Sequence, residues 1–217
     1  AETQALVDWT LGASAFGVEG SREYMESDDL DTRDRLKGGV FGEHVFSLFD
    51  RRLHVVPGAS AYYYSKWKWK FFPGLDIGYR LTEYMHLFAT GGYSFRAPTF
   101  TELYYDSPGN VGDEDLQPER TVSAEAGISF FYRYFSGQAS VFARFGYDII
   151  DWMRPVGARQ WKAKNLAIDT TYGIDITGKI PVDLNLFIMT LDIGYSALDS
   201  KRNTARAQEM YIQKNYR

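Results

Sequence analysis

The sequence predicts an all-β chain that forms part of an antiparallel transmembrane β-barrel. Most of its segments alternate apolar and polar residues with a period of two, and the connections between them are mostly short and long in turn. Several segments exceed the ~5–6 residues usual in soluble sheets and reach the ~9–11 residues that cross a bilayer. Aromatic residues make up 17% of the 217 residues, which suits the aromatic girdles of such a barrel.

Composition argues against several other classes. A net charge of −4 gives no support to nucleic-acid binding, and the absence of cysteine excludes disulfides and thiolate metal sites. No apolar run approaches the ~20 residues of a membrane-spanning helix. The first residues, AETQALVDWT, lack the positive and apolar regions of a signal peptide, so we expect a mature or internal piece of an exported protein.

The first two predicted strands differ in quality. Residues 5–16 alternate throughout, with Trp9 and Leu11 on the apolar face. Residues 36–49 alternate poorly, and we expect a β-bulge near Gly42–Glu43.

The remaining strands alternate more cleanly. Every second residue from Leu53 to Tyr63 shares one largely apolar face, and the segments that follow repeat the pattern. A further strand is expected to begin at Tyr211, so about nine to ten strands are present. The predicted strands after residue 50 are residues 53–63, 71–80, 84–95, 121–133, 139–150, 165–177 and 185–197.

The connections predict the orientation of the barrel, because outer-membrane barrels have short periplasmic turns and long extracellular loops. The long connections are residues 17–35, 96–120, 151–164 and 198–210, whereas residues 50–52, 81–83, 134–138 and 180–183 are short and 65–70 intermediate. Candidate girdle residues are Tyr62, Tyr63, Tyr64, Trp67 and Trp69 at one end, and Tyr132, Tyr134 and Phe135 at the other. A soluble, aromatic-rich sandwich is the alternative fold.

An ordered series of motifs resembles one family. FRAPTFTELYY spans residues 95–105 and is followed by the LxPE that ends at Glu119 and by SxExG at residues 123–127. VVPGASAYYYS, FFPGLDIGYRLTEYMHLFA, YDIIDWM and the Asn165…Tyr172-Gly173-Ile174-Asp175 pattern continue the likeness over nearly the whole chain. The series is similar to the TonB-dependent outer-membrane receptors. TELYYDSPGNVGDEDLQPE and YDIIDWM look most like the vitamin B12 (cobalamin) receptors of Bacteroidetes.

This resemblance implies a barrel of about 22 strands with an N-terminal plug, in the Gram-negative outer membrane. Residues 1–217 would then be one portion of the barrel domain, without the plug or the TonB box. The implied function is import of cobalamin or another corrinoid, powered through the TonB complex, and a surface lipoprotein is a further partner that the resemblance implies. A siderophore or haem receptor is the alternative, and a passive structural or adhesive barrel is an alternative of another class.

Aromatic and polar residues on the predicted extracellular loops are the candidate contacts for a large ligand. Trp152 and Trp161 have a second interpretation as girdle residues, and the others as ordinary solvated loop. The candidates are Tyr104, Tyr105, Asp106, Asn110, Trp152, Arg154 and Trp161.

Two further loop features suggest partners. The acidic loop that contains Asp28, Asp29 and Asp31 is oxygen-rich, as calcium sites are, and the resembled cobalamin receptors use loop calcium. Its spacing fits no twelve-residue calcium loop, so a solvated acidic loop is the preferred interpretation, and no other cofactor is expected. SKWKWK at residues 65–70 interleaves cations and aromatics, which suits contact with outer-membrane lipid and with lipopolysaccharide phosphate.

Several conspicuous residues have structural interpretations. Pro98 is expected to end a strand, Arg96 to pair with a carboxylate, and Glu125 to face the lumen near an arginine. His44, His54 and His86 are not paired with a nucleophile by any motif, and HExxH and phosphate-binding glycine loops are absent from the sequence. We therefore predict that the chain is not an enzyme, with a hydrolase dependent on His44 as the remaining alternative.

Overall fold

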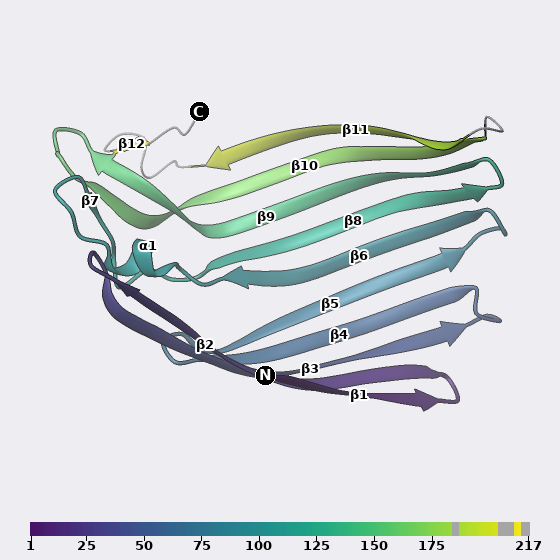
Figure 1. The fold of residues 1–217 in the computed structure, drawn as a ribbon, viewed down its shortest axis with the longest axis horizontal. Coiled ribbons are helices and arrows are strands. Elements are labelled where there is room, and N and C mark those ends of the chain that lie inside the picture. Colours follow the sequence, from purple (N-terminus) through teal and green to yellow (C-terminus); the bar gives the residue numbers. More distant parts are fainter. Residues whose placement is uncertain (184–186, 204–210, 214–217) are drawn as a thin grey trace.

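The computed structural model describes residues 1–183, 187–203 and 211–213, and most of these residues form one sheet whose long strands are all antiparallel (Figure 1). Neighbouring strands of the wall follow the order β1-β2-β3-β4-β5-β6-β8-β9-β10-β11, so nearly every strand pairs with the next one along the chain. Two short strands lie off this path, β7 against β10 and β12 against β9. The all-β meander confirms the predicted fold class, and ten strands of the described chain make up the wall.

The strands of the first half are β1 (Glu2–Trp9), β2 (Gly12–Ser27), β3 (Asp31–Leu48), β4 (Leu53–Tyr64), β5 (Lys68–Arg80) and β6 (Met85–Arg96). They are followed by α1 (Phe100–Tyr104), β7 (Asn110–Val111), β8 (Glu119–Tyr132), β9 (Phe135–Pro155), β10 (Trp161–Asp183), β11 (Ile188–Asn203) and β12 (Tyr211–Gln213). The described residues contain no helix that is long and apolar enough to cross a membrane.

One face of the sheet is apolar and remains uncovered in the described chain. Val141 and Ile193 on this apolar face are 58% and 55% exposed. Within each strand the alternate residues form the polar face, where Glu19 of β2 and Lys37 of β3 make an ion pair at 2.6 Å. The apolar rows are thus not buried against a second protein layer, as they would be in a sandwich.

The first predicted strand is wrong, because residues 5–16 belong to two strands. β1 ends at Trp9, which pairs with Gly12, and the chain reverses at residues 10–11. Gly12 has φ +152°, and a Cβ there would lie 1.6 Å from the Val45 carbonyl oxygen, so this position requires glycine. The reversal leaves Ala5, Val7 and Trp9 on the apolar face but shifts that face to even numbers after Gly12.

The long loop predicted for residues 17–35 is mostly a hairpin. β2 and β3 run to Ser27 and from Asp31, and only residues 28–30 connect them. Cross-strand ion pairs, including Arg22–Asp34 at 3.0 Å, line this extension. Because the extension carries polar residues on both faces, it lacks the alternation that identified the other strands.

A similar extension replaces the predicted loop 151–164. β9 continues to Pro155 and β10 begins at Trp161, which leaves residues 156–160 as the connection. At the other end of β10, residues 180–183 are strand rather than turn, and part of the predicted strand 185–197 falls outside the described residues.

Two further expectations need correction. Glu43 pairs with Gly58 and Phe46 with Val55 in the same register, so β3 has no bulge near Gly42–Glu43. The ladder is interrupted beside Pro57 instead, which lacks the N–H that a ladder needs. Tyr211 does begin a strand, as expected, but that strand pairs with the end of β9.

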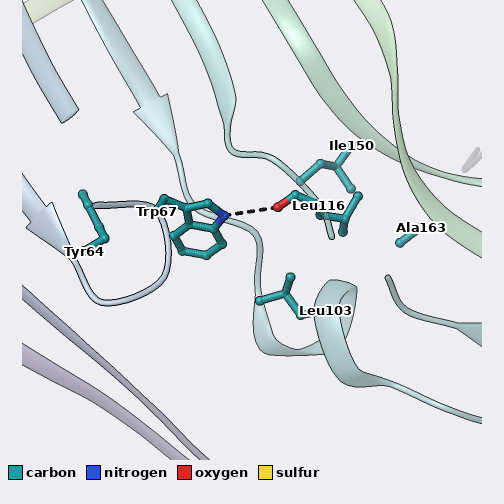
Figure 2. Packing of buried hydrophobic residues seen from close by; sticks show 6 residues of the cluster. All are labelled: Tyr64, Trp67, Leu103, Leu116, Ile150 and Ala163. Atoms are coloured by element: carbon teal, nitrogen blue, oxygen red, sulfur yellow. Dashed lines mark hydrogen bonds between the residues drawn. The ribbon is translucent and has the colours of Figure 1, made fainter. Parts of the chain in front are cut away.

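The two ends of the sheet differ. One end has the tight reversals 10–11, 49–52, 81–84 and 133–134, and we call it the turn end. The opposite end, here called the loop end, carries α1, β7 and the hydrophobic cluster shown in Figure 2. This cluster contains Tyr64, Trp67, Leu103, Leu116, Ile150 and Ala163. Tyr64 and Trp67 are therefore core residues and not girdle residues, whereas Tyr63 and Trp69 are exposed on the apolar side.

Candidate functional site: a mouth built at the loop end

The segment from Ala97 to Pro118, here called the mouth segment, is folded and does not behave as a free loop. Pro98 is fully buried and lies two residues after Arg96, the last residue of β6, so its missing N–H coincides with the end of the ladder as predicted. Thr99 caps α1, since its hydroxyl accepts from the Glu102 N–H at 3.1 Å and the Glu102 carboxylate accepts from the Thr99 N–H at 2.7 Å. This capping box stabilises a helix of only five residues.

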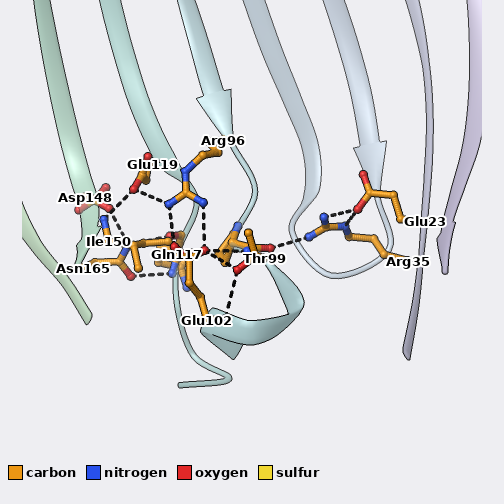
Figure 3. Close-up of polar contacts among 11 residues, drawn as sticks. Glu23, Arg35, Arg96, Thr99, Glu102, Gln117, Glu119, Asp148, Ile150 and Asn165 are labelled. Atoms are coloured by element: carbon orange, nitrogen blue, oxygen red, sulfur yellow. Dashed lines mark hydrogen bonds and ion pairs between the residues drawn. The ribbon is translucent and has the colours of Figure 1, made fainter. Parts of the chain in front are cut away.

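Arg96 holds both ends of the mouth segment (Figure 3). Its guanidinium donates to both oxygens of Glu102 at 3.0 Å, and to both oxygens of Glu119 at 2.8 and 2.6 Å. Glu119 in turn accepts from the Ile150 N–H at 2.8 Å. Two bidentate arginine–carboxylate pairs on one side chain are strong and geometrically specific, and they confirm the expected pairing of Arg96.

The electrostatics of Glu102 follow from this arrangement. Burial alone would raise the pKa of its carboxyl group. The hydrogen bonds from Arg96 and from Thr99 outweigh burial, so the pKa of Glu102 lies below its usual range. Glu102 therefore stays ionised at neutral pH. The ion-pair cluster of Arg96 with Glu102 and Glu119, here called the clamp, stays formed.

Other contacts attach the mouth segment to strands on both sides of it. Trp67, in the β4–β5 connection, donates its Nε1–H to the Leu116 carbonyl at 3.2 Å (Figure 2). Arg35 of β3 donates to the Pro98 carbonyl at 2.9 Å and pairs with Glu23. The segment thus reaches from β3 across the end of the β5–β6 ladder, which is formed only by residues 74–80 and 86–92.

Asn165 of β10 binds the C-terminal end of the mouth segment (Figure 3). Its amide accepts from the Gln117 N–H at 2.8 Å, and donates to the Gln117 and Asp148 carbonyls at 2.7 Å each. Both Asn165 and Glu119 belong to motifs identified in the sequence, and both act here as structural anchors.

The mouth segment also forms sheet with the hairpin of β9 and β10. β7 pairs in parallel with the start of β10, where Asn110 lies beside Trp161. The Trp161 N–H donates to the Gly109 carbonyl at 2.9 Å. The two sequence regions that hold the candidate ligand contacts are therefore joined into one surface.

Individual candidates occupy different environments on that surface. Tyr104 packs against the buried cluster and stacks with Phe100 at 6.3 Å between ring centroids, and Trp152 packs against the same cluster. The Arg154 guanidinium lies 4.9 Å from the centroid of the Trp161 ring. Trp152, Arg154 and Trp161 lie on strands and not on the loop that we expected.

The other candidates are more open to a ligand. Asp106 is exposed and forms an isolated bridge with Val111, whereas Tyr105 and Asn110 are half-buried. The Asn110 N–H donates to the Ser107 hydroxyl at 3.0 Å. Asp106 and the Tyr105 ring are thus the mouth-segment candidates with side chains least committed to the fold.

Sequence reasoning missed the cations that meet this surface from the first half of the chain. Arg33 of β3 lies 4.3 Å from the centroid of the Tyr104 ring, and Lys66 lies 5.2 Å from it. Both residues are more than 35 positions from Tyr104 in the sequence, so no local pattern could have indicated the contact.

Two hollows mark the polar face below the mouth. One, of about 250 Å³, is lined by residues that include Lys70, Gln117 and Arg120. The other, of about 290 Å³, contains Glu125 together with Arg144. Glu125 thus faces the predicted side of the sheet near an arginine, although it forms no ion pair among the described residues.

The acidic connection does not gather its carboxylates. Asp28, Asp29 and Asp31 are all exposed, and Asp31 lies 3.8 Å from Arg33. Across the described part of the chain, no group of three or more His, Cys, Asp or Glu side chains could hold a metal ion.

The structure pairs histidines with serines at the turn end. The Ser14 hydroxyl lies 2.7 Å from His44 Nδ1 and accepts from the Trp9 Nε1–H at 2.8 Å. Ser14 is buried. The three residues therefore link β1, β2 and β3 through side-chain hydrogen bonds.

Comparison with known proteins identifies the family. The model of the family "TonB dependent receptor-like, beta-barrel" matches residues 2–215. The chain belongs to this family. Its barrel wall accordingly lies in the outer membrane of Gram-negative bacteria, with the apolar face toward lipid.

Relatives add detail without defining the ligand. The chain is 31% identical over 102 residues to the "Vitamin B12 transporter BtuB" of Vibrio vulnificus (strain YJ016), and this match covers 47% of the chain and 16% of that protein. The crystal structure of the siderophore receptor PirA from Pseudomonas aeruginosa matches 93% of the chain and 41% of that receptor, with a TM-score of 0.75 and 18% identity.

A variant of the ferric enterobactin receptor PfeA from Pseudomonas aeruginosa matches 90% of the chain and 34% of that receptor, with a TM-score of 0.76 and 15% identity. At 18% and 15% identity, the likenesses to PirA and to PfeA show a shared fold and do not extend to the ligand. The chain thus spans well under half the length of each of these relatives.

Proposed function

We propose that this chain is part of the wall and mouth of an energised receptor that imports a scarce, bulky nutrient, and that the nutrient is a corrinoid of the cobalamin type. Membership of the TonB-dependent receptor family carries the proposal for import. The choice of corrinoid rests on the sequence match to a vitamin B12 transporter. Energy would reach the receptor through the TonB complex, so this portion would bind and conduct without making bonds.

In this proposal the loop end faces the outside of the cell and the mouth surface captures the ligand. Tyr104, Tyr105, Asp106, Asn110, Trp152, Arg154 and Trp161 are its proposed contacts. Their gathering from two distant regions by the β7–β10 pairing supports a common surface. Arg154 Nε is buried and lacks a hydrogen-bond partner among the described residues, which makes it a donor that a rearrangement on ligand binding would satisfy.

Equilibrium binding to the full-length receptor tests the ligand. Cyanocobalamin should bind, and ferric siderophores and haem should not compete with it. Preferential binding of a ferric siderophore would replace the corrinoid by the alternative nutrient. A receptor that binds none of these ligands would indicate a passive structural or adhesive barrel.

The mouth surface is tested by Arg154→Gln. Loss of one good polar contact should weaken cyanocobalamin binding about tenfold. Arg133→Gln is the matched control, because Arg133 lies beside Tyr134 at the turn end and stacks on an aromatic ring in the same way, with its guanidinium 5.3 Å from the ring centroid. Equal affinity in both variants would remove Arg154 from the contact set.

A further inference from the structure

The apolar face carries a groove that is separate from the mouth. It has a volume of about 620 Å³ and runs across β1 to β5. Small side chains at Ala59 and Ala61 and the bare backbone of Gly42 form its floor. Phe16 closes one side, since its ring lies so near Gly42 that an added Cβ there would be 3.1 Å away, and Phe71 closes the other.

A pair of aromatic side chains borders the groove toward the loop end. Tyr63 and Trp69 are paired across β4 and β5, two residues beyond Ala61 and Phe71. Two residues of strand correspond to about 7 Å. The two rings meet edge to face with centroids 5.6 Å apart, and both are exposed. Tyrosine and tryptophan in this position are typical of the boundary between hydrocarbon and head groups.

A single ammonium group follows the aromatic pair. Lys68 Nζ lies 3.4 Å from the Tyr63 hydroxyl and 3.2 Å from the Ser65 carbonyl, on the same side as the groove. Lys68 forms no ion pair within the described chain, so its charge is not neutralised by a carboxylate. The neighbouring lysines point elsewhere, Lys66 to Tyr104 and Lys70 into the hollow on the polar face.

The order along β4 and β5 is therefore an apolar groove, an amphipathic aromatic pair and a cation that forms no ion pair with a described carboxylate. We propose that this surface seats one molecule of lipopolysaccharide, with an acyl chain in the groove and a lipid A phosphate at Lys68. The inference rests on the orientation in the proposed function, because only a loop end that faces outward places Lys68 beside the outer leaflet. A glycolipid with several acyl chains and a phosphorylated sugar matches all three parts of the surface, and charge complementarity at Lys68 selects the phosphate.

The test uses the full-length receptor purified in detergent and measures bound lipid A by native mass spectrometry during titration. Lys68→Gln should weaken binding about tenfold, as expected for the loss of one charge-assisted contact. Lys66→Gln is the matched control, since it removes the same charge two residues away from a side chain that faces Tyr104. It should bind lipid A like the unmodified receptor.

A second variant tests the groove. Ala61→Phe fills it without adding polarity and should also weaken binding several-fold. Ala126→Phe places the same ring on the apolar face of β8, outside the groove, and should leave binding unchanged. Unchanged lipid A binding in both Lys68→Gln and Ala61→Phe would overturn the proposal.

The choice of ligand has its own comparison. Dephosphorylated lipid A and phosphatidylglycerol should each bind much more weakly than lipid A. If phosphatidylglycerol binds equally well, the surface recognises any anionic lipid and the assignment to lipopolysaccharide is wrong. Cyanocobalamin binding, measured on the same samples, should be the same in Lys68→Gln, Ala61→Phe and Ala126→Phe as in the unmodified receptor, because none of these residues contacts the mouth surface. A receptor that binds lipid A but no corrinoid would refute the proposed nutrient and leave this inference intact.

Discussion

Arg96→Ala should release the mouth segment from the barrel wall. The substitution removes four hydrogen bonds of 2.6–3.0 Å and leaves Glu102 and Glu119, each 15% exposed at the side chain, without their shared cation. Breaking a fully buried ion pair by removing one partner costs about 3–5 kcal/mol. Arg96 is 42% exposed, and solvent screening reduces the expected cost to about 2 kcal/mol.

Hydrogen exchange on the full-length receptor measures this local stability. A loss of about 2 kcal/mol corresponds to roughly 30-fold faster exchange, since 1.4 kcal/mol is a factor of ten. The amides to follow are those of Gly112 and Asp113, which donate to the Tyr105 and Glu102 carbonyls at 2.6 and 2.9 Å. Exchange elsewhere in the sheet should not change, because the ladders do not depend on Arg96.

Arg22→Ala is the control for this experiment. Arg22 pairs with Asp34 on the β2–β3 hairpin, and the two side chains are 62% and 47% exposed. An exposed pair of this kind contributes at most about 1 kcal/mol, so protection of the mouth segment should be unaffected. If Arg96→Ala leaves the protection of Gly112 and Asp113 as high as Arg22→Ala does, the clamp does not hold the segment and the reasoning is refuted.

Three further outcomes are expected. Val141→Arg should destabilise the barrel by about 2–4 kcal/mol in a refolding assay in lipid vesicles. Val141 is 58% exposed, but the exposed face meets hydrocarbon. A change within ~0.5 kcal/mol, which is typical of a soluble protein surface, would contradict this reasoning. Acidification should loosen the mouth segment, because a carboxyl group with a lowered pKa stabilises the fold above its unfolded pKa and loses that contribution as the pH falls through the folded pKa. Hydrogen exchange of the mouth-segment amides, corrected for intrinsic rates, should therefore accelerate below the usual carboxyl range. Glu102→Gln should abolish this acceleration. Trp67→Phe removes the bond to the Leu116 carbonyl and should cost about 1–3 kcal/mol of local stability, measured by proteolysis of the mouth segment, whereas resistance equal to that of the unmodified receptor would show that this bond is dispensable.

The regular parts of the fold were predictable because their signal is local. Side chains of a strand alternate between two faces, so residues such as Leu53 to Tyr63 reveal their apolar face without any knowledge of neighbouring strands. The prediction failed where this signal stops. Residues 17–27 and 151–155 are strand in the structure, but they extend with polar groups on both faces and resembled loop.

The turn at residues 10–11 was missed for a related reason. Alternation on either side of it continues in the sequence as if there were one strand, although the chain reverses at Gly12. Only the close approach of the Val45 carbonyl explains why glycine stands at that position. A reversal that preserves the apparent pattern cannot be detected from the pattern itself.

The class of the protein could be predicted from the sequence, because period-two alternation and the ordered motifs from FRAPTFTELYY onward are properties of short stretches of chain. The construction of the mouth depends instead on strand pairing. Its anchors lie on four strands and the β4–β5 connection, and they come together only after β3 to β10 have paired in register; they are Arg35, Trp67, Arg96, Glu119 and Asn165. The same pairing leaves Lys68, but not Lys66 or Lys70, beside Tyr63 on the side of the sheet that carries the groove. Such contacts depend on which strands become neighbours and on the direction that each side chain takes at a strand end. Neither property can be predicted from a short stretch of sequence.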